Sequence, residues 1–479
     1  MPHEILNYHK TLDNSSIRNN IDRRVELIKQ LRDIVSAHEQ EIIEAFRKDL
    51  NRNSFTTKLM DFSSFYGECE YFIANTHKLT KEQEVETAAM FKPHKSFIVP
   101  RPYGKILILV PFNYPMALSL TPLVGSIAAG NSSLIRMSNK TRNVSNLFLN
   151  LFTSMPKEIV QFMMCSYEEC DELIGAGFDK ILYTGSPSVG KHIMALAAET
   201  LTPVLLELGG KSPLIIDETC DLASSLPSAI WGKCTNAGQT CVAPDFVLIK
   251  RERLEEFKMK TNEIIKEFYP DGMLASNDFC RMIDDNSWNR VDELIKHSKG
   301  HAQMLCHDNS EPNKQERYIP FRSFIFESIE SAEHTEIMRR EIFGPVWPVL
   351  PYDDIEEVFA FLGRYPPPLS LYIYSENEET INRFVNDVPA GAVVANDTMI
   401  QFENHTLPFG GIGNSGMGNY HAKFTFEALS HMKPVMKRSF THNGLSKAIN
   451  AITGANKEKD IRFPPNTQEN EKKLDDFKK

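Results

Sequence analysis

The segment YTGSPSVGKH, residues 183–192, contains a spacing of residues that can hold phosphate groups. Gly185 and Gly190 are separated by four residues, and Lys191 follows directly, as in a P-loop. A P-loop needs a serine or threonine after that lysine to hold magnesium, whereas this chain has His192. A Walker-type acidic strand is not evident downstream. The spacing therefore disfavours a nucleoside triphosphatase and leaves a loop for a different phosphate.

The loop is expected to connect a buried strand, 180–184, to a helix that begins at Val189. Gly185 would allow a tight turn and Gly190 close packing, while Ser186 offers a hydroxyl and a backbone N–H. A helix N-terminus carries free N–H groups and partial positive charge, so it attracts anions. A pyrophosphate is a good candidate ligand, and a plain turn is the alternative interpretation.

Glu207 is a charged residue within an apolar run. It lies between Leu206 and Leu208 in the segment VLLELGG, 204–210. Burying a carboxylate is costly unless it has a partner or a task. Burial raises the carboxyl pKa toward neutrality, which suits a general base that activates water. A buried ion pair is the alternative interpretation.

The cysteines indicate free thiols. Cys165 and Cys170 are separated by four residues and have no histidine pair nearby, so neither zinc nor another metal is expected. The chain opens with MPHEILNYHKTLDNSS, which has no apolar signal segment. A reducing, cytoplasmic compartment is therefore expected. The eight cysteines are at positions 69, 165, 170, 220, 234, 241, 280 and 306.

The pattern around these residues predicts an α/β fold. Helical periodicity covers 15–50 and 56–79, with apolar residues three and four apart. After about residue 97, short apolar runs alternate with helical segments, which predicts a doubly wound parallel sheet with a nucleotide crevice at its strand-to-helix turns. A second α/β region runs from 204–217 to about 400. The expected strands are 105–110, 133–137, 159–164 and 180–185, followed by 246–249, 323–327, 346–350 and 371–374.

The uncharged segment 106–130 is long enough to cross a membrane. Its prolines at 111, 115 and 122 would interrupt such a helix. We therefore expect a strand, a turn and a buried helix, and no transmembrane anchor. The net charge of −10 and the pI near 5.8 also disfavour a nucleic-acid partner. A length of 479 residues suits two or three lobes.

Five motifs occur in an order that resembles the aldehyde dehydrogenase superfamily, in the branch that includes class 3 and fatty aldehyde dehydrogenases. The resemblance covers about residues 15–440. It implies an NAD(P)-binding domain over 1–80 and 100–208, a catalytic domain over 209–400, bridging segments over 81–99 and 401–440, and a polar tail over 441–479. The motifs are PFNYP (111–115), LELGGKSP (206–213), WGKCTNAGQTCVAP (231–244), EIFGPV (341–346) and LPFGGIGNSGMGNYH (407–421).

The resemblance implies a role for each site residue. Cys241 would be the nucleophile, Glu207 the base for hydrolytic water, and Asn113 an oxyanion-hole donor together with the Cys241 N–H. An aldehyde carbon is trigonal, so a thiolate must add before hydride can leave, and water must then hydrolyse the thioester. Glu341 would hold the nicotinamide ribose, with Phe343 beside the ring. A helix beginning near Cys241 is expected to lower the thiol pKa, and a buried, inert cysteine is the alternative.

The chain departs from the family pattern after the second nucleotide strand. Arg136, Met137, Ser138 and Asn139 stand where relatives have lysine, proline, serine and glutamate. Because an arginine can pair with phosphate through two N–H groups, we expect NADP as well as NAD to be accepted. Arg136 could instead replace the lysine at the ribose.

The resemblance further implies a homodimer and a substrate among medium- or long-chain aliphatic or aromatic aldehydes. Phe112, Tyr66 and Phe402 are candidates to line an apolar tunnel, and His421 to touch substrate. Packing is the alternative role for all four residues. A CoA-acylating enzyme and a non-catalytic relative are the competing interpretations, but Glu207 favours water as the acyl acceptor.

Overall fold

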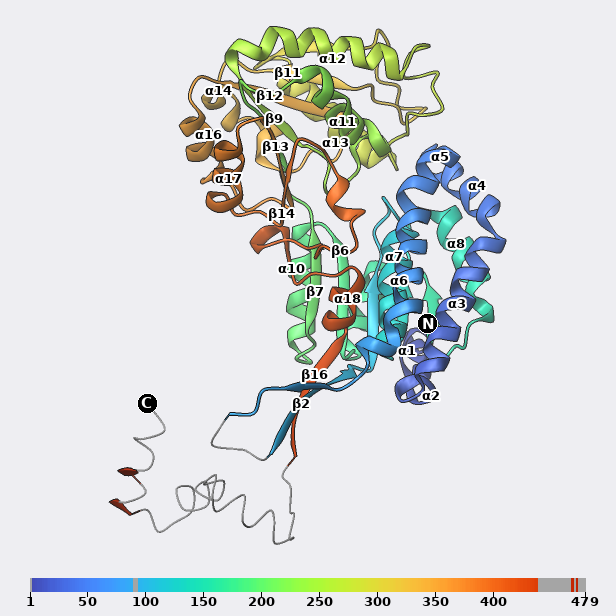
Figure 1. Cartoon of the computed structure of the whole chain (residues 1–479). Helices are drawn as coiled ribbons and strands as arrows, with labels where there is room; N and C mark the ends of the chain where they lie inside the picture. Colours follow the sequence, from blue (N-terminus) through green and yellow to red (C-terminus); the bar gives the residue numbers. More distant parts are fainter. Residues whose placement is uncertain (1, 89–93, 438–466, 469–470, 473–479) are drawn as a thin grey trace. The chain divides into compact units, whose positions relative to one another are not determined.

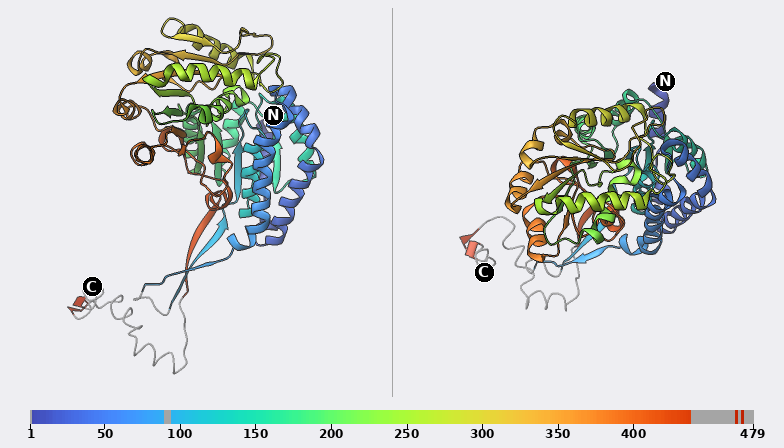
Figure 2. Two further views of the ribbon diagram at one scale, coloured as in Figure 1. Left: turned by 45° about the horizontal axis from the view of Figure 1, so that its top comes forward. Right: turned by 90° about the horizontal axis from the view of Figure 1, so that it is seen from above.

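The computed structural model describes residues 2–88, 94–437, 467–468 and 471–472. The described residues divide into two compact units. The first contains the residues up to Thr76 together with Pro102–Leu429, and the second contains His77–Arg101 and the described residues from Ser430 onward. Figures 1 and 2 show the ribbon of each unit.

The expected bridging segments and tail fall differently into these units. Most of 81–99 belongs to the second unit, except for residues 89–93, which lie outside the described part. The segment 401–440 is divided, because 401–429 belongs to the first unit. Nearly all of the tail 441–479 lies outside the described residues.

A six-stranded sheet in the first unit has the order β15-β7-β6-β3-β4-β5. From β3 the chain proceeds outward through β4 to β5 and then returns to β6 on the other side of β3. This reversal creates a topological switch point between β3 and β6, where open α/β sheets bind ligands. The predicted parallel sheet is confirmed in β3 (Lys105–Leu109), β4 (Ser132–Arg136), β5 (Val160–Met163), β6 (Lys180–Gly185) and β7 (Val204–Leu208), which β15 (Gly416–Met417) joins antiparallel.

A second sheet of the first unit has the order β10-β11-β12-β9-β8-β13-β14. Its strands are parallel except for the edge strand β10, which is antiparallel to β11. The sequence did not predict β10 or β14. The strands are β8 (Pro213–Ile216), β9 (Phe246–Lys250), β10 (Gln303–Cys306), β11 (Arg322–Ile325), β12 (Val346–Tyr352), β13 (Ser370–Tyr374) and β14 (Ala392–Ala395).

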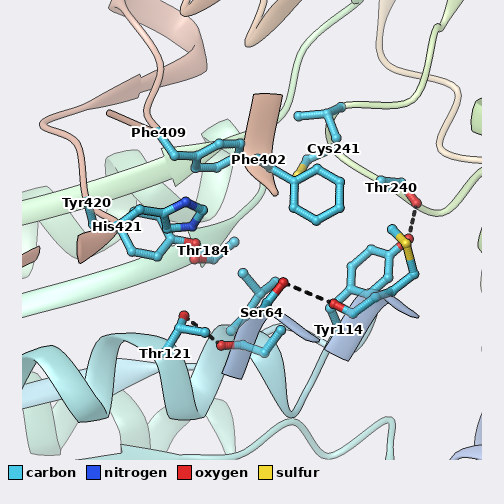
Figure 3. A pocket seen from close by; sticks show the side chains of 14 residues that line it. Ser64, Tyr114, Thr121, Thr184, Thr240, Cys241, Phe402, Phe409, Tyr420 and His421 are labelled. Carbon is cyan, nitrogen blue, oxygen red and sulfur yellow. Dashed lines mark hydrogen bonds between the residues drawn. The ribbon is translucent and has the colours of Figure 1, made fainter. Parts of the chain in front are cut away.

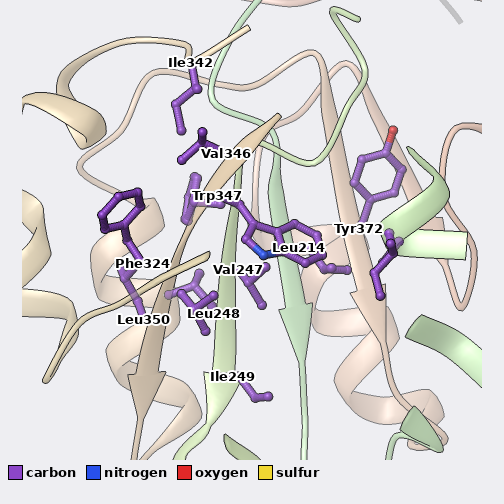
Figure 4. Packing of buried hydrophobic residues seen from close by; sticks show 14 of the residues in the cluster. Leu214, Val247, Leu248, Ile249, Phe324, Ile342, Val346, Trp347, Leu350 and Tyr372 are labelled. Carbon is purple, nitrogen blue, oxygen red and sulfur yellow. The ribbon is translucent and has the colours of Figure 1, made fainter. Parts of the chain in front are cut away.

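The second sheet carries the largest buried cluster of the first unit (Figure 4). Trp347 of β12 is completely buried, and its indole N–H donates to Ser323 Oγ at 2.6 Å. Tyr372 of β13 is also completely buried, with its hydroxyl donating to the backbone oxygen of Val242 at 2.5 Å. The core of this sheet therefore contacts the segment that follows Cys241 directly.

Helices α1 to α10 surround the first sheet. Helix α7 packs against β3 and β4, and α10 packs against β6 and β7. Their bounds are α1 (Pro2–Thr11), α2 (Ser15–Arg18), α3 (Ile21–Ala37), α4 (Glu39–Leu50), α5 (Ser54–Thr57), the π-helix η1 (Lys58–Phe62), α6 (Ser63–Leu79), α7 (Ala117–Ala129), α8 (Arg142–Leu151), the 3₁₀ turn η3 (Phe152–Ser154), α9 (Tyr167–Gly175) and α10 (Pro187–Ala198).

The later helices belong mainly to the second sheet. They are α11 (Leu222–Cys234), α12 (Leu254–Phe268), α13 (Asp285–Ser298), α14 (Ile329–Glu333), α15 (Glu336–Arg339), α16 (Ile355–Leu362), α17 (Glu378–Asp387) and α18 (Ala422–Ala428), with 3₁₀ turns η4 (Thr235–Gly238), η5 (Arg251–Arg253), η6 (Ile400–Phe402) and η7 (Gly413–Ser415). The second unit forms a three-stranded sheet, β1 (Gln83–Val85), β2 (Lys95–Pro102) and β16 (Ser430–Lys437).

The single helical region predicted over 15–50 is interrupted twice. The Asn20 side chain accepts a hydrogen bond from the Arg23 N–H at 3.0 Å and thereby caps the start of α3. His38 follows the last residue of α3, and its Nδ1 lies 2.8 Å from the backbone oxygen of Ile34. These local side-chain hydrogen bonds compete with continuous helix, although the apolar periodicity continues across them.

Candidate active site

Cys241 lies in a turn that follows a left-handed stretch of backbone. Asn236, Ala237 and Gly238 have φ angles of 53°, 52° and 71°. Only glycine adopts such angles without cost. At Gly238, a Cβ atom would also meet the carbonyl oxygen of Gly344. The second glycine of this motif is therefore required by both conformation and space.

The Gln239 side chain holds this strained stretch in place. It is completely buried. Its Nε2 donates to the backbone oxygens of Asn236, at 2.9 Å, and Arg281, at 3.0 Å, while its Oε1 accepts from the Ile283 N–H at 2.9 Å. This bridge fixes the backbone from which Cys241 projects.

Cys241 borders a pocket lined mostly by apolar and aromatic side chains (Figure 3). The lining comes from η1, α6 and α7, from the Cys241 turn, and from the segment 402–421. Leu118 of α7 and Phe409 contribute apolar surface, and Thr184 of β6 contributes a hydroxyl. The arrangement can hold an apolar group beside the thiol.

Of the three aromatic residues expected to line a tunnel, only Phe402 lines this pocket in the described chain. The Tyr66 hydroxyl instead donates to Glu39 Oε1 at 2.8 Å. The Phe112 ring packs edge-to-face against Phe343, with centroids 5.8 Å apart. Helical periodicity placed Tyr66 on an apolar face but could not show which way its hydroxyl points.

His421 lines the pocket, as the sequence had allowed. It is 6 % exposed, and its Nδ1 has no hydrogen-bond partner. The ring stacks on Phe409 at 5.1 Å. Burial, together with His405, lowers the His421 pKa to about 3, so the imidazole is neutral at physiological pH.

The Cys241 thiol has a raised pKa, contrary to the sequence-based expectation. Burial, and then the carboxylates of Glu341 and Glu207, raise it to about 12. No α-helix begins at this turn, because α11 ends before it at Cys234. The thiol therefore needs a change in its surroundings, or a proton acceptor, before it becomes a thiolate.

Glu207 sits on β7 directly opposite Thr184 of β6. It is 2 % exposed, and neither carboxylate oxygen has a hydrogen-bond partner. The Thr184 hydroxyl is also buried and unpartnered. Burial raises the Glu207 pKa well above its usual value. The buried partner that a structural ion pair would require is not found among the described residues.

Asn113 lies in the turn between β3 and α7 and is 3 % exposed. Its backbone oxygen accepts hydrogen bonds from Arg52 Nη2, at 2.5 Å, and from Asn236 Nδ2, at 3.2 Å. The neighbouring Tyr114 hydroxyl lies 2.6 Å from Thr240 Oγ1. The Asn113 turn is thus hydrogen-bonded to the Cys241 turn at two points.

Arg52 is a residue of this site that the sequence did not reveal. Its guanidinium forms a completely buried salt bridge with Asp61, 2.7 Å long, and lies over the Tyr114 ring. Asp61 also accepts the Ala117 N–H at 2.9 Å. The only available signal was a pair of opposite charges in the N-terminal helical region, which is indistinguishable from a surface pair without the fold.

The phosphate-loop candidates lie at the carboxyl edge of the first sheet. Gly185 ends β6, and a Cβ atom there would collide with the Tyr183 hydroxyl. Ser186 is the N-cap of α10, and its Oγ accepts from the Val189 N–H at 3.4 Å. Gly190 packs against Leu208 of β7. The first turn of α10 is exposed, so its N–H groups can receive an anion.

Arg136 ends β4 at the same edge. Register pairs it with Leu109 of β3, which in turn pairs with Tyr183 of β6. Arg136 is 8 % exposed, and its Nη2 donates to the backbone oxygen of Cys165 at 2.8 Å. Its Nε has no partner. Part of the guanidinium is therefore already engaged by the protein.

Glu341 and Phe343 lie in the turn before β12. The Glu341 carboxylate occupies the space that a Cβ atom of Gly209 would need. Burial, with the charge of Asp245, raises the Glu341 pKa to about 8. Phe343 has a φ of 46°, and its backbone oxygen accepts from Arg290 Nη2 at 3.2 Å. The charges of Glu341 and Glu207 both raise the Cys241 pKa, so both carboxylates act on the thiol.

A Rossmann-type switch point beside a partly buried thiol and two carboxylates, of which Glu207 is buried, is typical of dehydrogenases that form acyl-enzymes. The aldehyde dehydrogenase family model matches residues 16–435, and the chain belongs to this family. It therefore oxidises aldehydes to carboxylic acids with NAD or NADP. The resemblance deduced from the five motifs is confirmed.

Two relatives illustrate the similarity. A 4,4'-diaponeurosporen-aldehyde dehydrogenase from Staphylococcus aureus is 35% identical, over 90% of this chain and 92% of its own. The dimeric, NADP-preferring aldehyde dehydrogenase of Canis lupus familiaris is 33% identical, over 91% of this chain and 94% of its own. A solved structure of Staphylococcus aureus AldH in a substrate-bound state has a TM-score of 0.89 at 32% identity, covering 97% of each chain.

Among the described helices, none is both long enough and apolar enough to cross a membrane.

Proposed function

We propose that Cys241 is the nucleophile, Glu207 the general base and Asn113 an oxyanion-hole donor of this aldehyde dehydrogenase. One observation carries the proposal: the Cys241 thiol faces an apolar pocket within electrostatic reach of Glu207, whose two carboxylate oxygens are buried without partners. A buried, unpartnered carboxylate is costly to maintain, and it supports a role in catalysis.

The reaction begins when the Cys241 thiol loses its proton to solvent and the thiolate sulfur adds to the aldehyde carbon, so that the C=O electron pair moves to oxygen and a thiohemiacetal oxyanion forms. The developing oxyanion would receive hydrogen bonds from the Asn113 side chain and the Cys241 N–H, and each such donor contributes roughly 2.7–4 kcal/mol. The Arg52 and Asn236 hydrogen bonds to the Asn113 backbone position that turn. Because Asn113 is preorganised, little reorganisation is needed when charge develops.

The nicotinamide supplies the hydride acceptor that turns the thiohemiacetal into a thioester. The exposed first turn of α10 with Ser186 fits a pyrophosphate, and Glu341, which is half-buried, would fit ribose hydroxyls near Phe343. Glu207 then takes a proton from water, the resulting hydroxide attacks the thioester carbon, and the C–S bond breaks, which releases the acid and restores the Cys241 thiolate. Because the Glu207 pKa is raised, only the fraction of Glu207 that is ionised near neutral pH can accept this proton.

We propose that the enzyme accepts NADP as well as NAD. Arg136 ends the strand next to the switch point, and the residues that follow it in the sequence, Met137, Ser138 and Asn139, include no acid to repel a 2′-phosphate. The Nε of Arg136 has no hydrogen-bond partner, which supports a further hydrogen bond to a phosphate. The canine relative is named as dimeric and NADP-preferring. By this similarity we also propose a homodimer.

We propose medium- or long-chain aliphatic or aromatic aldehydes as the substrate class, and the apolar pocket wall of Leu118, Phe402 and Phe409 supports this.

We also propose an NAD(P)-binding domain over 1–80 and 100–208 and a catalytic domain over 209–400. The eight cysteines are all free, which supports a reducing compartment such as the cytoplasm.

The test is production of NADH and NADPH from decanal and benzaldehyde by the wild type and by Cys241→Ala. We expect reduced coenzyme from the wild type and none from the variant. Cys234→Ala is the matched control, because Cys234 is the other cysteine of the motif, is buried at 1 % exposure, and should not be needed. Full turnover by Cys241→Ala, or its loss in Cys234→Ala alone, would overturn the assignment.

A further inference from the structure

Cys165 and Cys170 lie on either side of the N-cap of helix α9. Ser166 is the N-cap of this helix and forms a capping box with Glu169. Cys165 precedes the cap and Cys170 is the fourth helical residue, the two positions whose side chains meet in a hydrophobic staple. Cys165 belongs to a buried cluster of the first unit, and Cys170 packs against the same cluster. The capping geometry therefore fixes them as a pair.

Arg136 faces this pair from the end of β4. Its Nη2 donates to the Cys165 backbone oxygen at 2.8 Å, and Asn139 Nδ2 donates to the same oxygen at 2.8 Å. The positive charge of the guanidinium favours a Cys165 thiolate. Its Nε is buried without a partner. A plain staple of two small apolar residues would not require a cation beside it.

The two thiols differ in acidity. The Cys170 thiol and the Arg136 guanidinium both favour a Cys165 thiolate, which lowers the Cys165 pKa. The neighbouring Cys165 and burial raise the Cys170 pKa. Burial raises the pKa of Cys241 and Cys234 to about 12. Cys165 is thus much more acidic than the proposed nucleophile, and a second thiol is in place beside it.

We propose that Cys165 and Cys170 form a reversible dithiol–disulfide site that hydrogen peroxide oxidises. The Cys165 thiolate attacks one peroxide oxygen; the O–O bond breaks, and the departing hydroxide takes a proton to become water. The Cys170 sulfur then attacks the sulfenic sulfur, the S–O bond breaks, and the leaving hydroxide takes the Cys170 proton. Overall, two thiols lose two electrons and one peroxide becomes two waters.

Oxidation would change the charge beside Arg136. In the reduced protein, the Cys165 thiolate partly neutralises the guanidinium. The disulfide carries no charge, so Arg136 becomes a stronger site for phosphate. This consequence rests on the proposed role of Arg136 in coenzyme binding. Oxidation should therefore tighten NADP binding at least about threefold and leave NAD binding nearly unchanged.

The test uses the full chain with Cys241→Ser, which removes the proposed nucleophile from the peroxide reaction. Peptide mass spectrometry after peroxide treatment should show a Cys165–Cys170 disulfide, reversed by dithiothreitol. Cys170→Ser should stop at an oxidised Cys165 without the disulfide. Cys306→Ser, which removes an exposed thiol, is the matched control and should leave the disulfide unchanged. Absence of the disulfide from the parent would overturn the inference.

Calorimetric titration of NADP and NAD then separates this inference from the proposed function. Tighter NADP binding by the oxidised protein supports the link to Arg136. If Arg136→Met leaves NADP binding unchanged while the disulfide forms, the coenzyme role of Arg136 fails and the dithiol site stands. If Arg136→Met weakens NADP binding but oxidation has no effect on it, the charge coupling is refuted.

Discussion

The Arg52 guanidinium donates a hydrogen bond from Nη2 to the backbone oxygen of Asn113, at 2.5 Å. Its other terminal nitrogen, Nη1, donates to Asp61 Oδ2 at 2.7 Å, and both side chains are completely buried. Asp61 in turn accepts the Ala117 N–H at the start of α7. One ion pair from the N-terminal helices therefore holds both ends of the turn that carries the proposed oxyanion donor.

Arg52→Lys tests this arrangement. Lysine keeps the charge but cannot reach both Asp61 and Asn113 with a rigid fork. We expect the free energy of unfolding to fall by about 3 kcal/mol, because the buried ion pair is weakened. We also expect kcat/KM to fall by about 10²-fold, because the Asn113 turn shifts. Urea unfolding and steady-state kinetics measure the two effects.

Arg47→Lys is the matched control. Arg47 forms an exposed pair with Glu44, at 2.8 Å, and exposed pairs contribute about 0–1 kcal/mol. It should change neither quantity appreciably. A less stable Arg52→Lys protein with wild-type kcat/KM would show that the ion pair supports the fold alone.

Glu207→Gln should separate acylation from hydrolysis. Without a base, thioester hydrolysis should slow by about 10²–10⁴-fold, while hydride loss proceeds. Mixing the variant with aldehyde and coenzyme should then give a burst of reduced coenzyme equal to the enzyme concentration. Stopped-flow absorbance measures the burst. Hydroxylamine, which attacks thioesters directly, should restore turnover.

Glu68→Gln provides the control for burying an amide in place of a carboxylate. Glu68 is also completely buried, but its Oε1 has a partner in the Ala422 N–H at 2.8 Å. We expect no burst from it. A Glu207→Gln enzyme that hydrolyses as fast as the wild type would remove Glu207 from the role of base.

The sequence was sufficient for the parts of the site that local patterns encode. Apolar runs predicted the strands that end at Arg136 and Gly185, and the motif around Cys241 predicted the thiol at the pocket. Glu207 was visible because a charge within an apolar strand is unusual in itself. These signals are local, so they can be recognised without knowledge of the fold.

Other features depend on contacts between distant segments. Arg52 and Asn113 are 61 positions apart, and nothing near residue 52 shows that its charge is buried. The raised pKa of Cys241 arises from burial and from Glu341 and Glu207, which only the assembled sheets bring near the thiol. The sequence-based expectation of an acidic thiol considered one local helix and missed the stronger effects of burial and of the two carboxylates.

The pH dependence of Cys241 reactivity follows from its neighbours. The negative charge of Glu207 disfavours the thiolate and helps to raise the thiol pKa to about 12. Removing that charge in Glu207→Gln should lower the pKa, so that thiolate appears at lower pH. Between about pH 7 and 10, iodoacetamide should therefore alkylate Cys241 faster in the variant than in the wild type at each pH.

The direction of that shift distinguishes two roles for Glu207. A shift of the alkylation curve to lower pH fits a base that serves water and only repels the thiolate. A shift to higher pH would mean that Glu207 accepts the thiol proton directly, contrary to the assignment made above. Cys241→Ser, which should show no alkylation at this site, confirms that the measured thiol is Cys241.

Leu118 offers a test of the substrate class. It lines the pocket from α7 and is only half-buried, so a larger side chain can enter the pocket without displacing the core. Leu118→Trp should exclude the far end of a long aldehyde chain. Each methylene removed from apolar contact costs about 0.8 kcal/mol, so losing two should lower kcat/KM for decanal by about tenfold.

Propanal should be almost unaffected by Leu118→Trp, because a short chain ends before it reaches this wall. Leu118→Met, which conserves volume, is the matched control and should keep the wild-type increase of kcat/KM with chain length. An equal loss for propanal and decanal in Leu118→Trp would mean that the substitution disturbs the Cys241 end of the pocket. The chain would then lie along a different wall, and the proposed fit to long apolar aldehydes would lose its structural basis.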